Sequence, residues 1–345
     1  MMFRQIWVDP RDADLQRIVW SPDPSQPPVH YQLRTVTYSV TCSPYLSLRV
    51  IKQLCHDEGH LWPDAVPVVM NERYADDILS GADDLETARQ LRDQVIGLLR
   101  SGGFPLRKWV ANDAELLADL TQEARLRPTW REISDAGLVS ELGVSWDPAS
   151  DTFRLTSPAA REQDTKQSIL AGIASLFDPC GWLARTILQA KLLVQDLWRA
   201  RLDWDEVVPA SMARRWSAFT TELKLIQGFF IPRWIGSSAL SKIYLHAFLD
   251  ASHRAIGAVV YSQLQDSSMQ VRCHILLAKT KLAFIRSLKP SATPQARMTI
   301  ARLELCATLL AAKLLRLVVS EWNIPIEHCY AWCDSQVVLR WLRSA

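Results

Sequence analysis

The order of the elements predicted for the last third of the chain constrains its fold more than any other feature of the sequence. Three apolar runs with the composition of strands follow one another, at 243–249, 256–261 and 271–278. A helical pattern over 301–320 comes next, then a strand over 329–332 and a helix from Ser335. This β-β-β-α-β-α order predicts a separate α/β domain with a mixed sheet.

The residues in front of this domain divide into two further regions. We expect three domains in all, with boundaries at 1–155, 156–238 and 241–345. The stretch 231–238, which contains proline and glycine, predicts the linker before the α/β domain. The middle region has a helical pattern over 164–227, broken at 178–181 and near Pro209.

Short strands and two long helices are predicted for the first 155 residues. The expected strands lie at 6–8, 17–20, 31–40, 66–70, 78–79 and 104–110, with a hairpin at 138–146 and 152–155. Pro44 suits the first turn of a helix that we expect to reach about Asp57. Asp83 or Asp84 is expected to cap a second helix, which the glycines at 102–103 would end.

The composition excludes several classes of protein. Hydrophobic residues make up 48% and charged residues 22% of the chain, which excludes wholesale disorder. No apolar run reaches the ~18 residues that a membrane helix needs. Acidic residues follow soon after the N-terminal methionines, unlike in a signal peptide. We therefore expect an intracellular protein, cytoplasmic or nuclear, that is neither membrane-bound nor secreted.

The net charge of +2 requires that any charge used to bind nucleic acid be local. The clearest basic segment runs from Lys279 to Leu303 without a single acid. It includes Lys281 and Lys289 and is the best candidate contact for a phosphate backbone. A solvated loop explains the same residues equally well.

Two adjacent acids, Asp76 and Asp77, are the strongest local signal of chemistry. They end the run Tyr74-Ala75-Asp76-Asp77, which we expect at the tip of a hairpin between two apolar strands. Adjacent carboxylates repel each other unless a cation joins them. Hard oxygen ligands suit Mg²⁺, and paired Mg²⁺ ions steady the attacking and leaving oxygens in nucleotidyl transfer. A solvated acidic turn is the alternative interpretation.

A second group of acids lies in the α/β domain. Asp250 and Asp334 each end an apolar strand, and Glu304 lies in the first turn of an apolar helix. Acids at the ends of neighbouring strands in a mixed sheet can converge on a pair of metal ions. The alternatives are a helix-dipole contact for Glu304 and an N-cap role for Asp334.

Several segments together resemble the Pol polyprotein of BEL/Pao-type retrotransposons. They are Phe-Arg-Gln-Ile-Trp-Val at 3–8, and the runs at 35–38, 43–46, 74–83, 103–109, 176–179, 249–252 and 302–307. The run Tyr-Ala-Asp-Asp-Ile-Leu-Ser-Gly-Ala-Asp at 74–83 and the run Arg-Leu-Glu-Leu-Cys-Ala at 302–307 are the specific ones. The resemblance covers nearly the whole chain.

The resemblance implies an α+β reverse-transcriptase palm remnant with a helical thumb and connection. An α/β ribonuclease H-like domain with a mixed sheet would follow it. The implied function is RNA-directed DNA synthesis and cleavage of RNA in the hybrid, by two-metal chemistry with Mg²⁺ or Mn²⁺. The implied partners are an RNA template, a DNA primer, the RNA–DNA hybrid and the remainder of the Pol polyprotein.

The resemblance also assigns roles to individual residues. Asp76 and Asp77 match the metal-binding acids of the polymerase. The first three ribonuclease H acids are matched by Asp250, Glu304 and Asp334. The segment that supports template and nucleotide is matched by Ser43, Pro44 and Tyr45, and we add Tyr74, Lys281 and Lys289 as residues that bind substrate.

The chain also departs from the family pattern. The first polymerase Asp and the fourth ribonuclease H acid have no match, Ser39 replaces an expected glycine, and 284–295 looks inserted. We therefore expect a piece of Pol truncated at both ends, with impaired activity and no primer extension by the isolated chain. The alternative function is a non-catalytic, nucleic-acid-binding remnant of a retroelement.

Overall fold

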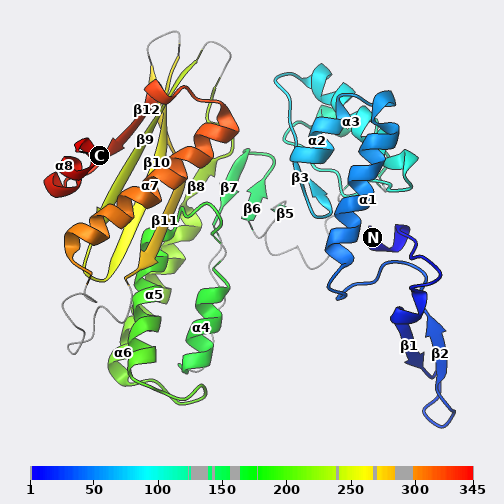
Figure 1. Cartoon of the computed structure of the whole chain (residues 1–345), viewed down its shortest axis with the longest axis horizontal. Coiled ribbons are helices and arrows are strands. Elements are labelled where there is room, and N and C mark those ends of the chain that lie inside the picture. Colours follow the sequence, from blue (N-terminus) through cyan, green and yellow to red (C-terminus); the bar gives the residue numbers. More distant parts are fainter. Residues whose placement is uncertain are drawn as a thin grey trace. The chain divides into compact units, whose positions relative to one another are not determined.

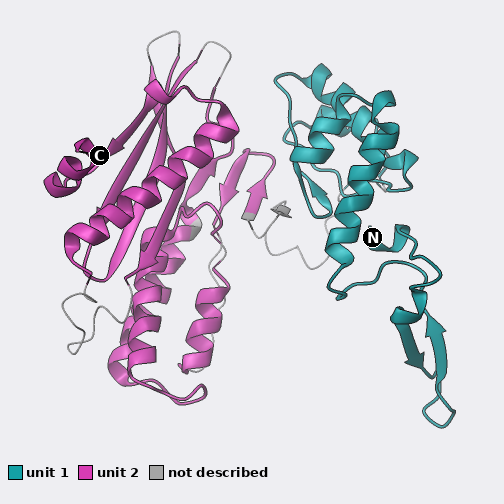
Figure 2. Ribbon diagram, in the orientation of Figure 1, with its two compact units in different colours: residues 1–137 teal, residues 138–345 magenta. Residues whose placement is uncertain are grey.

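The computed structural model describes most of the chain. It covers residues 2–122, 124–125, 139–141, 144–155, 164–176, 178–237, 241–266, 270–283 and 298–344. The chain forms two compact units, residues 1–137 and residues 138–345 (Figure 2). Over the described ranges, no helix is both long and apolar enough to cross a bilayer.

The described residues of unit 1 form three α-helices and two small hairpins (Figure 1). The helices are α1 (Ser43–Glu58), α2 (Ala65–Asn71) and α3 (Leu85–Ser101). The hairpins pair β1 (Arg17–Trp20) with β2 (Val29–Gln32), and β3 (Arg73–Tyr74) with β4 (Asp77–Ile78). Short 3₁₀ helices lie at Phe3–Gln5, Ala13–Gln16, Gly59–Leu61 and Ala114–Leu117.

The two long helices of unit 1 begin and end as the sequence predicts. Pro44 lies in the first turn of α1. The Asp84 side chain caps α3 by accepting a hydrogen bond from the Thr87 amide at 2.8 Å, and α3 ends at Gly102. Buried residues of α1, α2 and α3, such as Ile51, Val69 and Leu98, form one core.

The strand predicted at 66–70 is wrong, because this run belongs to helix α2. Its Val-Pro-Val-Val-Met composition suits a strand, but Pro67 is tolerated in the first turn of a helix. Ala65, Val68 and Val69 then lie on one face of α2 and are buried against α1 and α3. Tertiary burial at this helical spacing outweighs the local strand propensity.

Most of the other strands predicted in unit 1 are shortened or absent. The strand at 17–20 is confirmed, whereas 31–40 contributes only to β2. In 6–8 and 104–110 the structure has single bridges, Trp7 with Thr35 and Trp109 with Arg125. A strand needs a neighbouring strand along its length to pair its backbone N–H and C=O groups. Each of these segments has a neighbour at one residue only, so neither forms a strand.

The turn before α1 places Ser39 in the left-handed region, with φ 64°. The sequence resemblance implied a glycine at this position, and a side chain with this φ is strained. Ser43 then starts α1 and its hydroxyl donates to the Thr37 carbonyl at 2.6 Å, which closes the turn onto the helix. The turn is therefore well anchored although its central residue is unfavourable.

We predict that Ser39→Gly stabilises unit 1 by about 1 kcal/mol, because glycine adopts a positive φ without the cost that a side chain brings. Urea unfolding of the full chain, followed by helix content, measures the change. Ser39→Ala is the matched control, since alanine keeps the strain and should show no gain. Equal stability of the glycine and alanine variants would contradict the assignment of strain.

Unit 2 begins with a small sheet and a group of helices. The sheet is antiparallel in the order β5 (Val139–Glu141), β6 (Val144–Asp147), β7 (Thr152–Arg154) and β8 (Phe230–Pro232). The helices are α4 (Lys166–Ala174), α5 (Ala184–Arg199), α6 (Ala210–Leu223) and a 3₁₀ turn, Lys224–Gly228. The predicted hairpin and the helical pattern are confirmed. Part of the predicted linker is wrong, because β8 pairs with β7 as an edge strand.

From residue 241 on, the described residues of unit 2 form a four-stranded mixed sheet with two α-helices, as predicted. The strands are β9 (Lys242–Ala251), β10 (Ala255–Gln265), β11 (Val271–Leu282) and β12 (Cys329–Trp332), in the order β11-β10-β9-β12. The neighbours β11, β10 and β9 are antiparallel, and β12 is parallel to β9. The helices are α7 (Ile300–Trp322) and α8 (Gln336–Arg343), with a 3₁₀ turn at Ile326–His328.

Helix α7 covers one face of this sheet (Figure 1). Its buried residues Leu303, Ala307 and Leu310 pack with strand residues such as Leu245 and Val260. The strands alternate buried and more exposed positions, so their other side chains point away from α7.

The turn before α5 is fitted against the outer edge of β11. The Ala278 amide donates to the Cys180 carbonyl at 2.8 Å, and Trp182 Nε1 donates to the Leu276 carbonyl at 3.1 Å. Asp178 Oδ2 accepts from the Leu183 amide at 2.8 Å, and burial raises the pKa of the Asp178 carboxyl. Gly181 has φ 74°, and a Cβ there would lie 1.6 Å from the Ala278 carbonyl oxygen. This close approach covers an edge strand that would otherwise be open to other chains.

We predict that Gly181→Ala destabilises unit 2 by at least about 2 kcal/mol, because it adds both a clash with backbone and a strained φ. A thermal melt of the full chain measures the loss. Gly228→Ala is the control, since a Cβ at Gly228 meets nothing within 4 Å. If Gly181→Ala is as stable as Gly228→Ala, the turn before α5 does not pack against β11.

Candidate metal and nucleic-acid site

Two of the predicted acids lie at the ends of neighbouring parallel strands, Asp250 as the last residue but one of β9 and Asp334 two residues after β12. Phe248 of β9 pairs with Trp332, the last residue of β12. Two residues further along, the chains reach Asp250 and Asp334, both of which are exposed. Because parallel strands run in the same direction, these acids lie at the same end of the sheet.

Glu304 is tied to this end of the sheet by a hydrogen bond. Its Oε2 accepts from the Ser335 hydroxyl at 2.5 Å, and Ser335 directly follows Asp334. Ser335 is buried and is itself the N-cap of α8, where its Oγ accepts from the Val338 amide at 3.4 Å. The cap is therefore Ser335 and not Asp334, so the alternative role for Asp334 is wrong.

The turn after Asp250 is anchored to the helices of unit 2. Asp250 Oδ1 accepts from the Ala251 amide at 2.7 Å. Arg254, in the same turn, donates to Asp196 Oδ1 on α5 at 2.9 Å, and Asp196 Oδ2 accepts from Arg215 on α6 at 2.9 Å. These ion pairs connect α5, α6 and the segment that presents Asp250.

Carboxylate oxygens are suitable ligands for Mg²⁺ and Mn²⁺, so the donor set at this end of the sheet fits such an ion. In the described part of the chain, however, no group of three or more His, Cys, Asp or Glu side chains is arranged to hold a metal. The backbone brings Asp250, Glu304 and Asp334 to one end of the sheet. Two of the carboxylates bond instead to Ser335 and to the Ala251 amide.

The other predicted acid pair lies on the β3–β4 hairpin of unit 1. Tyr74 pairs with Asp77, and the turn between them has Ala75 at φ 52°. Asp76 is exposed at the turn and Asp77 is half-buried. Arg73 supports the hairpin by donating to the carbonyls of Val69, at 3.2 Å, and of Ala75, at 2.9 Å. Burial lowers the pKa of the Arg73 guanidinium.

The residues predicted to bind substrate differ in how available they are. Ser43 is buried and its hydroxyl is used within the turn before α1, whereas Tyr45 and Tyr74 are exposed. Pro44 lies in the first turn of α1. Lys281 is exposed on β11, but Lys289 and the predicted insertion lie outside the described residues.

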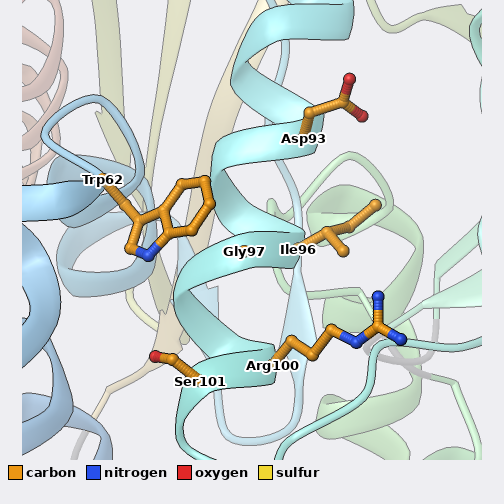
Figure 3. Close-up of a pocket in the computed structure, with 6 residues that line it drawn as sticks. All are labelled: Trp62, Asp93, Ile96, Gly97, Arg100 and Ser101. Carbon is orange, nitrogen blue, oxygen red and sulfur yellow. The ribbon is translucent and has the colours of Figure 1, made fainter.

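A hollow of about 480 Å³ lies along α3 in unit 1 (Figure 3). The Trp62 ring packs on Gly97, where a Cβ would lie 2.4 Å from it. Asp93, Arg100 and Ser101 complete the lining with Ile96. None of the predicted site residues lines this hollow, so it gives no support to a site there.

Three residues of the site were missed by the sequence reasoning. Ser335 joins Glu304 to the end of β12, and Arg254 and Asp196 hold the turn after Asp250. Ser335 had a detectable signal, because a serine directly before an apolar helical run is a good N-cap. The pair Arg254–Asp196 joins residues remote in sequence and leaves no local pattern.

Comparison with known proteins gives one family for this region. Residues 165–335, just under half of the chain, match the family model described as Pao retrotransposon-like RNaseH-like domain. A search of curated proteins found no match. The match and the mixed sheet of unit 2 agree with the predicted ribonuclease H-like domain. Residues 165–335 are therefore a Pao retrotransposon-type, ribonuclease H-like region.

Proposed function

We propose that unit 2 is the ribonuclease H part of a retrotransposon Pol protein and hydrolyses the RNA strand of an RNA–DNA hybrid. The observation that carries the proposal is the parallel pairing of Phe248 on β9 with Trp332 on β12, two residues before Asp250 and Asp334, with Glu304 bonded to Ser335 beside them. The family match to residues 165–335 supports a substrate that is a nucleic acid.

Asp250, Glu304 and Asp334 would hold Mg²⁺ or Mn²⁺ at the end of the sheet. Such ions activate a water molecule and stabilise the leaving oxygen in phosphodiester hydrolysis. Ser335 would orient the Glu304 carboxylate through their hydrogen bond, as residues that hydrogen-bond metal ligands commonly do. The ion pair between Arg254 and Asp196 would hold the turn that presents Asp250.

We predict that Mn²⁺ raises the melting temperature of the full chain, because an ion that binds only the folded state stabilises it by about 2.7 kcal/mol at a hundredfold excess over Kd. In Asp250→Asn this shift should shrink, and stability without metal should stay equal or rise as repulsion falls. The rate at which this variant cleaves a labelled RNA–DNA hybrid should also fall. Loss of a residue that only hydrogen-bonds a metal ligand typically costs roughly 10- to 100-fold, and loss of the ligand itself should cost more.

The matched control is Asp205→Asn, which removes an exposed carboxylate between α5 and α6. It should leave both the Mn²⁺ shift and the cleavage rate unchanged. An identical Mn²⁺ shift in Asp250→Asn and wild type would refute a metal site at these acids. A chain that binds the hybrid but never cleaves it, at any Mn²⁺ concentration, would instead support the non-catalytic remnant.

We also propose that the β3–β4 hairpin is the metal-binding part of an RNA-directed DNA polymerase. The exposed Asp76 at the turn, next to Asp77, supports this assignment together with the family resemblance of the run at 74–83. Tyr74 and Tyr45 are exposed and available to a template or primer. Ser43 would act indirectly, through the turn before α1.

Iron-directed backbone cleavage tests this hairpin separately from unit 2. Fe²⁺ that replaces Mg²⁺ is oxidised to Fe³⁺ by added hydrogen peroxide, which splits into hydroxide and a hydroxyl radical, and this radical cuts the chain near the ligands of the ion. We predict cuts close to the hairpin in wild type, and their loss in the double variant Asp76→Asn, Asp77→Asn. Cuts near Asp250 and Asp334 should persist in that variant and serve as the internal control. Hairpin cuts of unchanged intensity would exclude these two acids as ligands.

A further inference from the structure

Three arginine side chains of unit 2 surround the carboxylate of Asp196. Asp196 Oδ1 lies 2.9 Å from Arg254 Nη2, and Asp196 Oδ2 lies 2.9 Å from Arg215 Nη1. Arg199, three residues further along the chain, is 3.6 Å from Oδ1. We call Arg199, Arg215 and Arg254 the arginine cluster. Because a single carboxylate faces three guanidinium groups, the cluster carries an excess of positive charge.

Three separate elements bring the arginine cluster together. Asp196 and Arg199 lie on α5, Arg215 lies on α6, and Arg254 lies in the turn between β9 and β10. Helix α5 packs against both α6 and β11 (Figure 1). The cluster therefore depends on the packing of unit 2, and no local sequence pattern reveals it.

The arginine cluster keeps hydrogen-bonding capacity for an external group. Both oxygens of Asp196 already accept, one from Arg254 and one from Arg215, and 3.6 Å is too long for a hydrogen bond to Arg199. The three arginine side chains are 40 to 48% exposed. A guanidinium group has five N–H donors, so most donors of the cluster are not used by Asp196.

The elements around the cluster add positive charge and little negative charge. Asp196 is the only acid in α5, and β11 contains none. Lys279 and Lys281 are exposed on β11. The Ala283 amide, just beyond them, donates to the Arg254 carbonyl at 2.8 Å, which ties the end of β11 to the turn that carries Arg254.

The environment of Lys191 on α5 shows that charges in this region already repel each other. Its Nζ donates to the Thr280 carbonyl of β11 at 3.3 Å. Burial lowers the pKa of the Lys191 ammonium, Asp178 opposes this shift, and the charge of Lys279 adds to it. Like charges at short range favour the binding of an anion that joins them.

The acids that follow α5 in the chain are held by other contacts. The loop between α5 and α6 contains Asp203, Asp205 and Glu206, and Glu206 Oε2 accepts from the Asp203 amide at 3.0 Å. The Val208 amide of this loop donates to the Asp164 carbonyl, just before α4, at 3.0 Å. In the described part of the chain, none of these three loop acids pairs with the arginine cluster.

We propose that the arginine cluster binds backbone phosphates of the RNA–DNA hybrid beside the acids at the end of the sheet. The proposal rests on the proposed function of those acids. Arg254 follows Asp250 by four residues across the same turn, so a phosphate on the cluster would hold the substrate next to Asp250. The planar fork of a guanidinium group matches phosphate oxygens, and such contacts position a nucleic acid without reading its sequence. The matched family region contains all three arginines.

Binding of a fluorescein-labelled RNA–DNA hybrid of eighteen base pairs to the full chain tests the arginine cluster. Fluorescence anisotropy is measured in EDTA, which prevents metal-dependent cleavage, over a series of salt concentrations. The double variant Arg199→Gln, Arg215→Gln, here the glutamine variant, leaves Arg254 and Asp196 as a neutral pair. Its plot of log affinity against log salt concentration should be less steep than that of wild type by about 1 to 2, because each phosphate contact contributes about 0.9.

Two further variants separate charge from structure. Arg199→Gln alone removes no hydrogen bond to Asp196 and should lower the salt slope by about 0.9. The double variant Arg199→Lys, Arg215→Lys keeps the charge and should keep the slope within about 0.5 of wild type. The matched control is Lys313→Gln, Arg316→Gln, which removes two exposed charges from α7 and should leave the slope unchanged. Equal slopes for the glutamine variant and this control would overturn the proposal.

A peptide of eighteen glutamates distinguishes phosphate from carboxylate as the ligand. Wild type should bind this peptide at least about tenfold more weakly than the hybrid at the same salt concentration, because guanidinium pairs on a rigid backbone suit phosphate groups. If the glutamine variant binds the hybrid as wild type does but loses affinity for the peptide, the cluster serves an acidic protein segment and the proposal is wrong.

The proposed hydrolase activity is scored by a different variant. Asp250→Asn should lose cleavage of the hybrid while its salt slope stays that of wild type. If wild type never cleaves but the glutamine variant still has the lower slope, the hydrolase assignment fails and the phosphate site stands. If cleavage occurs and depends on Asp250 but the glutamine variant keeps the wild-type slope, the phosphate site fails alone.

Discussion

The parallel pairing of β12 with β9 is the interaction on which the rest of unit 2 depends. Parallel neighbours cannot be joined by a tight turn, so the chain must cross over between β11 and β12, and α7 makes that crossing. The helix buries one face of the sheet and brings Glu304 to the end where β9 and β12 stop. The face of β9 and β12 that α7 does not cover carries exposed residues, among them Phe248, Tyr330 and Trp332.

The helices in front of the sheet are physically part of the same unit. The turn at Gly181 covers the edge of β11, and Asp196 on α5 holds the turn that follows Asp250. The matched family region likewise includes these helices, since it begins at residue 165, directly before α4. A sheet whose outer edge is closed by its own chain also avoids pairing with other chains.

Much of the fold of unit 2 was predictable, whereas parts of unit 1 were not. The strand at 329–332 was predicted with its observed bounds, because apolar residues between a turn and a capped helix leave little choice. The strand predicted at 66–70 was wrong because the sequence Val-Pro-Val-Val-Met is compatible with both a strand and a buried helix. Part of the predicted linker became β8 because β7 offers it a partner, which no local pattern reveals.

For the candidate site, the sequence alone determined which acids end strands and which helix carries Glu304, since alternation, turns and caps are local properties of the chain. Only the tertiary structure decided that β12 pairs with β9 just before Asp334 and Asp250, and that Ser335 bonds Glu304. Each of these contacts joins residues far apart in the sequence. Their formation depends on strand pairing and packing, which local periodicity does not specify.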